Sequence, residues 1–163
     1  MQSTLPPSAT PCPPIAPPPT LTAAPTPKDY APGTPQADLP TATLRIITAC
    51  RTVTLKVQIA STGPQQEQGL MGRTDMPQDE GMLFDFGRDD AGDTFWMKNT
   101  PTPLSIAFIS ADQRIVTLDE MAAFDDQTFH ASNGPYRYAV EANAGFFTRY
   151  GVKVGDRVEI VKQ

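Results

Sequence analysis

The chain has 163 residues, 18 prolines, two cysteines and a formal net charge of −5 at neutral pH. Nucleic-acid binding relies on clustered Lys and Arg, and the sequence contains no such cluster. No apolar run reaches the roughly 18 residues that cross a bilayer, so we expect neither a nucleic-acid partner nor a transmembrane segment.

The first 41 residues differ sharply in composition from the rest. Thirteen of the 18 prolines precede Thr41, and only three charged residues accompany them. Such a segment buries too little apolar surface to offset the entropy of ordering it, and proline favours an extended polyproline conformation. We therefore expect a disordered Pro/Thr/Ala-rich spacer over residues 1–41. Residues 42–163 are then a single domain, long enough for one hydrophobic core.

The two cysteines fall on either side of this boundary. Cys12 lies in the spacer, and Cys50 lies where a hairpin turn is expected. A disulfide between them would stabilise the fold by about 3 to 4 kcal/mol through loop closure. Because nothing else in the sequence holds Cys12 in place, two unpaired thiols are favoured, with the disulfide as the alternative.

The start of the chain lacks the basic and apolar stretches of a secretory signal. A proline-rich spacer in front of a compact domain is nevertheless typical of envelope proteins. We therefore expect an extracytoplasmic protein that is periplasmic, envelope-attached or secreted.

Alternating hydrophobicity predicts short strands throughout the domain. Between residues 53 and 59, Val, Leu, Val and Ile alternate with polar residues, which is the period of a half-buried strand. In chain order, the expected strands are 44–48, 53–59, 82–86, 94–98, 104–110, 114–121, 136–142 and 157–161. This spacing favours a mainly β fold, a compact β-sandwich or barrel of about eight short strands.

Two short helices complete the expected elements. Thr62 and Gln65 match a capping box, and Pro64 fits the first turn, which predicts a helix over 63–71. A second helix is expected over 144–150, ended by Gly151 in the favoured C-terminal position.

The expected strand 94–98 places two kinds of side chain on opposite faces. Phe95 and Met97 share the face that suits a core, while Trp96 and Lys98 share the other and lead into Asn99 at a turn. An aromatic platform beside hydrogen-bonding groups suits the stacking of a sugar-like or other small polar ligand. The alternative is that the tryptophan packs in the core and the lysine extends to water.

Glu141 is expected on a strand between two apolar neighbours, where an ionised carboxylate needs a partner. Arg73 and Lys98 are the candidate partners. One interpretation is a structural ion pair. The other is that these three residues converge on a polar ligand, with Arg73 gripping a carboxylate or phosphate group.

Signatures of catalysis and metal binding are sparse. The single histidine, His130, is a poor basis for a zinc site. Together with Ser132 and Asp125 or Asp126 it supplies the residue types of a hydrolytic triad, but in a segment without regular structure. The aspartates at 85, 89, 90 and 93 lack the spacing of a calcium loop. We predict no catalytic residue, no metal and no cofactor.

Several sequence blocks resemble one family when taken in order. They are Gly69-Leu70-Met71 with Arg73, Gly81-Met82-Leu83-Phe84, Phe95-Trp96-Met97-Lys98-Asn99-Thr100, Pro103-Leu104 with Phe108, Glu141 with Ala144-Gly145, and Gly155-Asp156. From about residue 53 to 158 the chain resembles domain of unknown function family 192. The resemblance implies a compact, mainly β fold, often exported, and no established activity. It also implies an acidic residue after the Pro-Leu pair, where this chain has Ser105.

The expected function is a non-catalytic, extracytoplasmic binding or accessory module. Arg73, Trp96, Lys98, Asn99 and Glu141 would surround one shallow polar pocket for a sugar, a carboxylate or a phosphorylated compound. The rival interpretation is an enzyme that uses Glu141 as acid or base beside Lys98. A third is a structural domain that binds a partner along a sheet edge.

Overall fold

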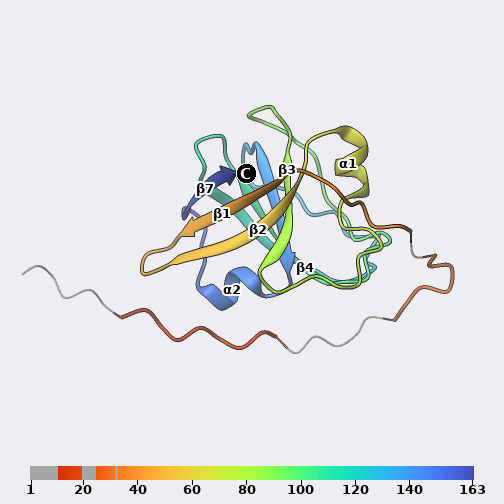
Figure 1. The fold of residues 1–163 in the computed structure, drawn as a ribbon, viewed down its shortest axis with the longest axis horizontal. Coiled ribbons are helices and arrows are strands. Elements are labelled where there is room, and N and C mark those ends of the chain that lie inside the picture. The colour runs from red at the N-terminus through yellow and green to blue at the C-terminus, as the bar shows by residue number, and fades with distance from the viewer. Residues whose placement is uncertain (1–10, 20–24, 32) are drawn as a thin grey trace, which may run out of the picture.

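A computed structural model describes residues 11–19, 25–31 and 33–163. The described residues form a seven-stranded sheet in the order β5-β4-β6-β3-β2-β1-β7, with two short helices (Figure 1). The elements are β1 (Thr41–Ile47), β2 (Thr52–Ala60), α1 (Gly63–Gln68), β3 (Glu80–Asp85), β4 (Leu104–Ile109), β5 (Ile115–Met121), β6 (Tyr138–Asn143), α2 (Phe146–Tyr150) and β7 (Arg157–Lys162).

The mainly β class is confirmed, and two details of the prediction are not. The expected strand 94–98 forms only an isolated bridge between Phe95 and His130. Asn99 adopts a left-handed φ of 54°, which turns the chain before a ladder can extend. The strand count is therefore seven in the described residues, and these strands belong to one sheet instead of the two that a sandwich requires.

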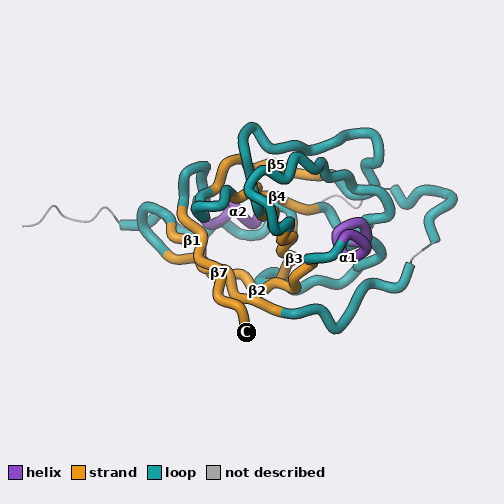
Figure 2. Tube along the Cα trace, turned by 90° about the horizontal axis from the view of Figure 1, so that it is seen from above, coloured by secondary structure: helices purple, strands orange, loops and turns teal. Residues whose placement is uncertain are grey.

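The sheet curls into a half-barrel (Figure 2). Neighbouring strands are antiparallel except for β2 and β3, which are parallel. At one end, the two edge strands β5 and β7 approach each other through a bridge between Arg114 and Arg157. The Val158 N–H also donates to the Gln113 carbonyl at 2.8 Å. This contact brings the two edges together and shields part of them from pairing with another chain.

The inner core lies inside the curl. Every strand contributes to it, and α2 adds Phe146 and Phe147. In β1 and β2, buried residues alternate with exposed or half-buried ones, because successive side chains point to opposite faces. The alternation that predicted these strands is therefore also what fills the inner core.

The outer core lies on the opposite face of the central strands. Met82, Phe84, Ile106 and Phe108 of β3 and β4 meet apolar side chains from the loops, among them Phe95. Because β3, β4 and β6 are covered on both faces, their burial is nearly continuous. The loops that follow α1 and β3 therefore act as the second layer of the fold.

Both helices begin or end as their capping residues predict. The Gln65 side-chain oxygen accepts a hydrogen bond from the Thr62 N–H at 3.1 Å, which completes the capping-box contact. Gly151 ends α2 with a left-handed φ of 72°. The first helix stops at Gln68, three residues earlier than expected. No helix in the described part of the chain is long and apolar enough to span a membrane.

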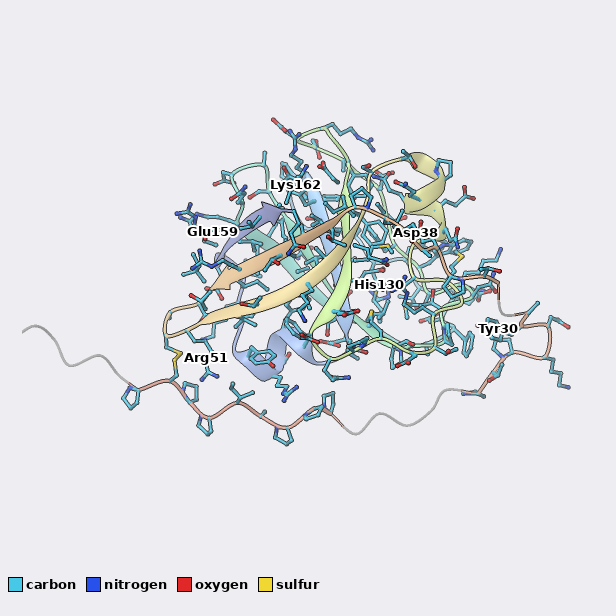
Figure 3. All side chains as sticks on the ribbon, viewed as in Figure 1. Tyr30, Asp38, Arg51, His130, Glu159 and Lys162 are labelled. Atoms are coloured by element: carbon cyan, nitrogen blue, oxygen red, sulfur yellow. A yellow bond between two sulfur atoms is a disulfide. The ribbon has the colours of Figure 1, made fainter. Side chains whose placement is uncertain are left out.

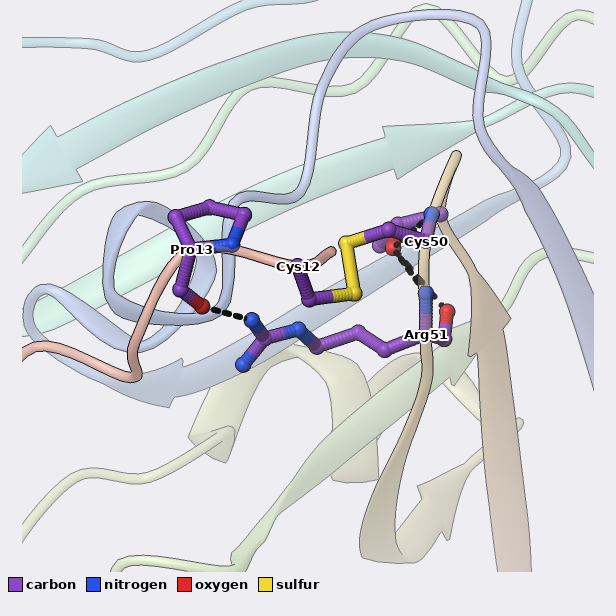
Figure 4. Close-up of a disulfide and its surroundings, with 5 residues drawn as sticks. Cys12, Pro13, Cys50 and Arg51 are labelled. Carbon is purple, nitrogen blue, oxygen red and sulfur yellow. Dashed lines mark hydrogen bonds between the residues drawn. A yellow bond between two sulfur atoms is a disulfide. The ribbon is translucent and has the colours of Figure 1, made fainter. Parts of the chain in front are cut away.

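Cys12 and Cys50 form a disulfide, with their Cα atoms 5.3 Å apart (Figure 4). The expectation of two unpaired thiols is therefore wrong. Residues 11–19 run beside the β1–β2 hairpin and α2, where the Arg51 guanidinium donates to the Pro13 carbonyl. The Arg149 Nε also donates to the Ala16 carbonyl at 2.6 Å. These contacts join residues distant in sequence, so composition could not reveal them.

The described residues before Thr41 form no helix or strand, yet they contact the domain further along. The Gln36 side-chain amide donates to the carbonyls of Gln65 and Gly69 at 3.0 and 2.8 Å. The Tyr30 ring lies 4.9 Å from the Phe124 ring, at the opposite end of the molecule from Glu159 in Figure 3. The division of the chain at residues 41 and 42 stays a prediction.

Candidate functional site

A pocket of about 330 Å³ opens between α1, β3 and the loop that carries Trp96. Its walls combine apolar side chains, among them Leu70, Phe84, Phe95 and Trp96, with polar ones from α1 and the loop, and Glu141 of β6 also lines it. The pocket is at the small end of the range for small-molecule sites. It is therefore the part of the fold most suited to a compact ligand.

Glu141 lies in the middle of the sheet. In register it faces Met82 on β3 and Ile106 on β4, and both belong to the outer core. Its exposed fraction is 5%. The neighbouring strands supply only apolar side chains at this level, so the sheet itself offers the carboxyl group no polar partner.

Burial raises the pKa of Glu141 to about 8, from an ordinary 4.5. Neither a hydrogen bond nor an ion pair from the described residues offsets this burial. A buried carboxylate without a partner is costly, so the group keeps its proton instead. At neutral pH the pocket therefore contains a neutral carboxylic acid that can donate one hydrogen bond.

Two glycines of the family blocks shape the pocket by close approach. A Cβ at Gly81 would collide with the Glu141 carbonyl oxygen, so only glycine lets β3 and β6 pair at this point. Gly69 has a φ of 47°, and a Cβ there would lie 3.3 Å from the Phe84 ring. The end of α1 can therefore rest directly on the wall of the pocket.

Trp96 lies at the mouth of the pocket and is 38% exposed. Its ring stacks on Phe129 with 5.7 Å between centroids and 18° between planes. The Lys98 ammonium lies 5.0 Å from the same indole, while Phe95 and Met97 are buried. The expected separation of side chains is confirmed even without a strand, because a locally extended backbone is enough to alternate them.

Lys98 and Asn99 line a second, shallower depression that shares Trp96 with the pocket. The conformation of Asn99 has a local explanation. It occupies a left-handed position that asparagine tolerates, and its carbonyl accepts the Gly72 N–H at 2.9 Å. Two of the five expected site residues therefore lie beside the pocket that contains Glu141 and do not line it.

Arg73 lies in a different part of the surface. Its guanidinium donates to the Gln36 carbonyl at 3.0 Å and to the Gln58 side-chain oxygen at 2.6 Å. It lines a third depression, along β2 and β3. The expected ion pair of Glu141 with Arg73 or Lys98 is therefore not formed. Arg73 instead fixes the segment before β1 against β2.

Several residues of the site have no recognisable signal in the sequence. Phe84 and Leu70 read as ordinary core residues, although both line the pocket. Phe129 lies in a segment without periodicity, so nothing in the sequence indicated its stacking on Trp96. The only usable signal was the Gly69-Leu70 block, which contributes directly to the pocket wall.

The weak catalytic and metal patterns have structural explanations. The His130 Nδ1 lies 2.6 Å from Asp119, and not beside Asp125 or Asp126 as a triad would need. Asp89 and Asp93 pair with Arg137 and Arg88 respectively. Within the described ranges, no group of three His, Cys, Asp or Glu side chains is close enough to hold a metal ion.

Ser105 occupies the place where the family pattern has an acidic residue. Its hydroxyl donates to the Glu120 carboxylate, with O–O distances of 2.7 and 2.8 Å. The Gly145 N–H donates to the Ser105 Oγ at 2.8 Å and to Glu120 at 3.0 Å. A carboxylate from the adjacent strand β5 therefore lies next to this position, where it binds the backbone just before α2.

The comparisons with known proteins agree with this fold. A family model described as Uncharacterized ACR, DUF192, matches residues 45–160. The chain belongs to the DUF192 family. The match includes both helices and all seven strands of the DUF192 domain except residues 41–44 of β1 and 161–162 of β7.

Two solved structures are similar to this DUF192 chain. A protein from Sinorhizobium meliloti 1021, provisionally named a transcription regulator, is 41% identical with a TM-score of 0.72, over 77% of this chain and 97% of that one. A protein of unknown function from Novosphingobium aromaticivorans DSM 12444 is 30% identical with a TM-score of 0.71, over 83% and 99%. The comparison with curated proteins finds no match.

Proposed function

We propose that this DUF192 chain is a non-catalytic, extracytoplasmic module that binds a small ligand in the pocket beneath Trp96. One observation carries the proposal: Glu141 is 5% exposed, lines an aromatic pocket and has no partner among the described residues. A fold that needed only stability would be served better by an apolar residue at this place. A ligand group that pairs with the carboxyl group would supply the partner that the described residues do not.

The chemistry of the lining narrows the ligand. Its ionisable side chains are Glu67, Asp93 and Glu141, and no Lys, Arg or His is among the described residues that line the pocket. Arg73, on which the expectation of a carboxylate or phosphorylated ligand rested, lies elsewhere. We therefore favour a ligand with an apolar or sugar-like body and a group that pairs with a carboxyl.

Thermal shift with a broad panel of small compounds tests this function, because a ligand specific to the folded state raises the Tm. Trp96 is the single tryptophan of the chain and lines the pocket, so its fluorescence reports binding there. We expect at least one compound to raise the Tm and change the emission of the native protein, but not of Glu141→Leu.

Glu80→Gln is the matched control, because it removes a carboxylate from β3 at a position that lines a different depression. It should bind like the native protein. Equal Tm shifts in the native protein and in Glu141→Leu would contradict the proposed site, as would a broad panel without any stabilising compound.

An enzyme is the second candidate, and the pKa of about 8 at Glu141 is the observation that favours it. The Lys98 that the enzymatic interpretation requires lines the neighbouring depression instead of the pocket. Binding is therefore the better-supported function. NMR spectra of the stabilising compound should stay unchanged over hours with the protein. A new product formed by the native protein, and not by Glu141→Gln, would establish the enzyme instead.

The extracytoplasmic location is supported by the bond between Cys12 and Cys50, since disulfides persist mainly in oxidising compartments. Trapping free thiols with an alkylating reagent at the moment of cell lysis tests it. We expect both cysteines to escape alkylation in the native host. Two alkylated cysteines would contradict an oxidising location.

The regulator name of the Sinorhizobium protein is not extended to this chain. This chain has a net charge of −5 and no basic cluster, which gives no support for contact with DNA phosphates.

A further inference from the structure

We propose that the ligand is a small amine, whose ammonium group donates to Glu141 and whose hydrocarbon body lies against Phe84, Phe95 and Trp96. This inference rests on the proposed binding function and specifies the chemical class of the ligand. It depends on three features of the pocket, which are its charges, its aromatic walls and the buried carboxyl group of Glu141, which has no partner among the described residues.

The charges that line the pocket have one sign. Glu67 lies exposed on α1, and Asp93 lies on the loop, where Arg88 pairs with it. Glu141 is the deepest of the three. Because Arg88 already pairs with Asp93, the outer negative charge comes mainly from Glu67, which repels an anionic ligand and attracts a cation, and no Lys, Arg or His is among the described lining residues. The electrostatics therefore select a positive group over a negative one.

The aromatic walls favour the same class of ligand. Phe84 and Phe95 meet edge to face, with 4.9 Å between ring centroids, which holds both rings in place. Aromatic faces attract ammonium groups, and most strongly where water is excluded. The Lys98 ammonium 5.0 Å from the Trp96 ring shows that this indole already accepts such a neighbour. A neutral alcohol would gain the apolar contacts without this attraction.

Binding of a positively charged ligand should change the ionisation of Glu141. In the empty pocket, burial holds the pKa of Glu141 at about 8, and the group is protonated at pH 7. From the elements around it, α1 presents Glu67 and the loop presents Asp93, while β3 and β4 present the apolar Met82 and Ile106. An ammonium ion at hydrogen-bond distance stabilises the carboxylate and lowers its pKa. Binding at pH 7 should therefore release close to one proton.

The experiment uses three compounds that share one body and differ in one group: 2-phenylethylamine, 2-phenylethanol and 3-phenylpropanoate. Binding to the full chain is measured by calorimetry at pH 7 in two buffers of different ionisation enthalpy, and Trp96 emission confirms the location. We expect the amine to bind at least about tenfold more tightly than the alcohol, and the acid to bind most weakly. Only the amine should release a proton.

Two variants show whether Glu141 causes the preference for the amine and the release of a proton. Glu141→Gln keeps the shape and cannot ionise, so the proton release should vanish and the preference for the amine should fall to the part that Glu67 and the aromatic walls supply, while Trp96 still responds to the alcohol. Glu80→Gln, outside the pocket, should retain both. Proton release by Glu141→Gln, or an amine preference as strong as that of the native protein, would overturn the inference.

The outcomes separate this inference from the proposed function. If the alcohol binds as tightly as the amine, with no proton released, the pocket binds ligands but the amine class is wrong. Stronger binding of the acid would also overturn the amine class. If none of the three binds and the broad panel also stabilises nothing, the pocket and the amine fail together.

Discussion

The inner and outer cores of this DUF192 domain are built on opposite faces of the same strands, and they differ in what covers them. The inner core is formed by alternating strand residues and α2, and its members are hydrophobic throughout. The outer core is closed by loops, and among its apolar side chains lies the carboxyl group of Glu141. Strands and α2 fill the first face, whereas the loops leave room for a pocket on the second.

The comparison shows where a small β domain can place a binding site without losing stability. A buried carboxyl group without a partner is unfavourable anywhere in a fold. In the inner core it would interrupt the contacts between all seven strands. In the outer core it lies beside a pocket of about 330 Å³, where a ligand can reach it. The inner core thus stabilises the fold, and the outer core has the features of a binding site.

The largest loss of stability should come from a substitution in the inner core. Leu55 on β2 is fully buried, and Leu55→Ala should lower the free energy of unfolding by about 2 to 5 kcal/mol through lost burial and a cavity. Urea denaturation measures this. Thr54→Ala, exposed on the same strand, should cost less than about 1 kcal/mol. Similar losses for both variants would show that the inner core is not tightly packed.

Glu141, in the outer core, should make the free energy of unfolding fall as the pH rises. The pKa of Glu141 is raised to about 8 in the folded state, so the folded chain holds a proton that the unfolded chain releases above its ordinary pKa. Stability should therefore fall as pH rises from 5 to 8, by up to about 1.4 kcal/mol per pH unit from this group.

Glu141→Gln isolates that contribution, because the other titrating groups are common to both proteins. The difference in unfolding free energy between the variant and the native protein, measured by urea denaturation, should grow steadily in favour of the variant up to pH 8. Parallel curves would mean that the carboxyl group ionises normally.

Ser105→Ala should have a smaller effect, at the border of the inner core, because Ser105 shares a face of β4 with Ala107 and Ile109. It removes the hydroxyl that links Glu120 to the Gly145 N–H, which should cost about 1 to 2 kcal/mol in thermal or chemical unfolding. Ser61→Ala, exposed before α1, should change stability by less than about 0.5 kcal/mol. If the two variants are indistinguishable, the Ser105–Glu120 contact does not replace the acidic residue of the family pattern.

The smallest effect on stability should come from the surface of the outer core. Phe129 is 60% exposed and stacks on Trp96, so Phe129→Ala should cost less than about 0.5 kcal/mol. The emission of Trp96 should nevertheless shift to longer wavelength, because the indole becomes more exposed to water. An unchanged spectrum would show that the stacking does not persist in solution.

The strands that form the inner core were easier to predict from the sequence than the loops that cover the outer core. Alternation located β1 and β2, since one face of each strand is buried and the other is largely exposed. The segment around Trp96 has the same alternation but lies over the outer core, so it was taken for a strand. Side-chain alternation reports an extended backbone and one buried face, but it does not report the hydrogen-bonding partner.

The candidate site was predictable only in part. The contrast between Trp96 and its buried neighbours followed from local geometry, and Glu141 was singled out by its apolar neighbours in sequence. The position of Arg73 depends on Gln36 and Gln58, which are 37 and 15 residues away. Cys12 likewise meets Cys50 across 38 residues. Contacts of this range depend on the whole fold and leave no periodic signal.

Above all, Glu141 should be a neutral carboxylic acid in the pocket at physiological pH, since it has no partner among the residues that the structure describes. The most direct measurement is the NMR titration of its side-chain carboxyl carbon in the ¹³C-labelled chain, assigned by comparison with Glu141→Gln. We predict a midpoint at a pH of about 8. A midpoint near the ordinary 4.5 would contradict the account, because the group would then be solvated or paired.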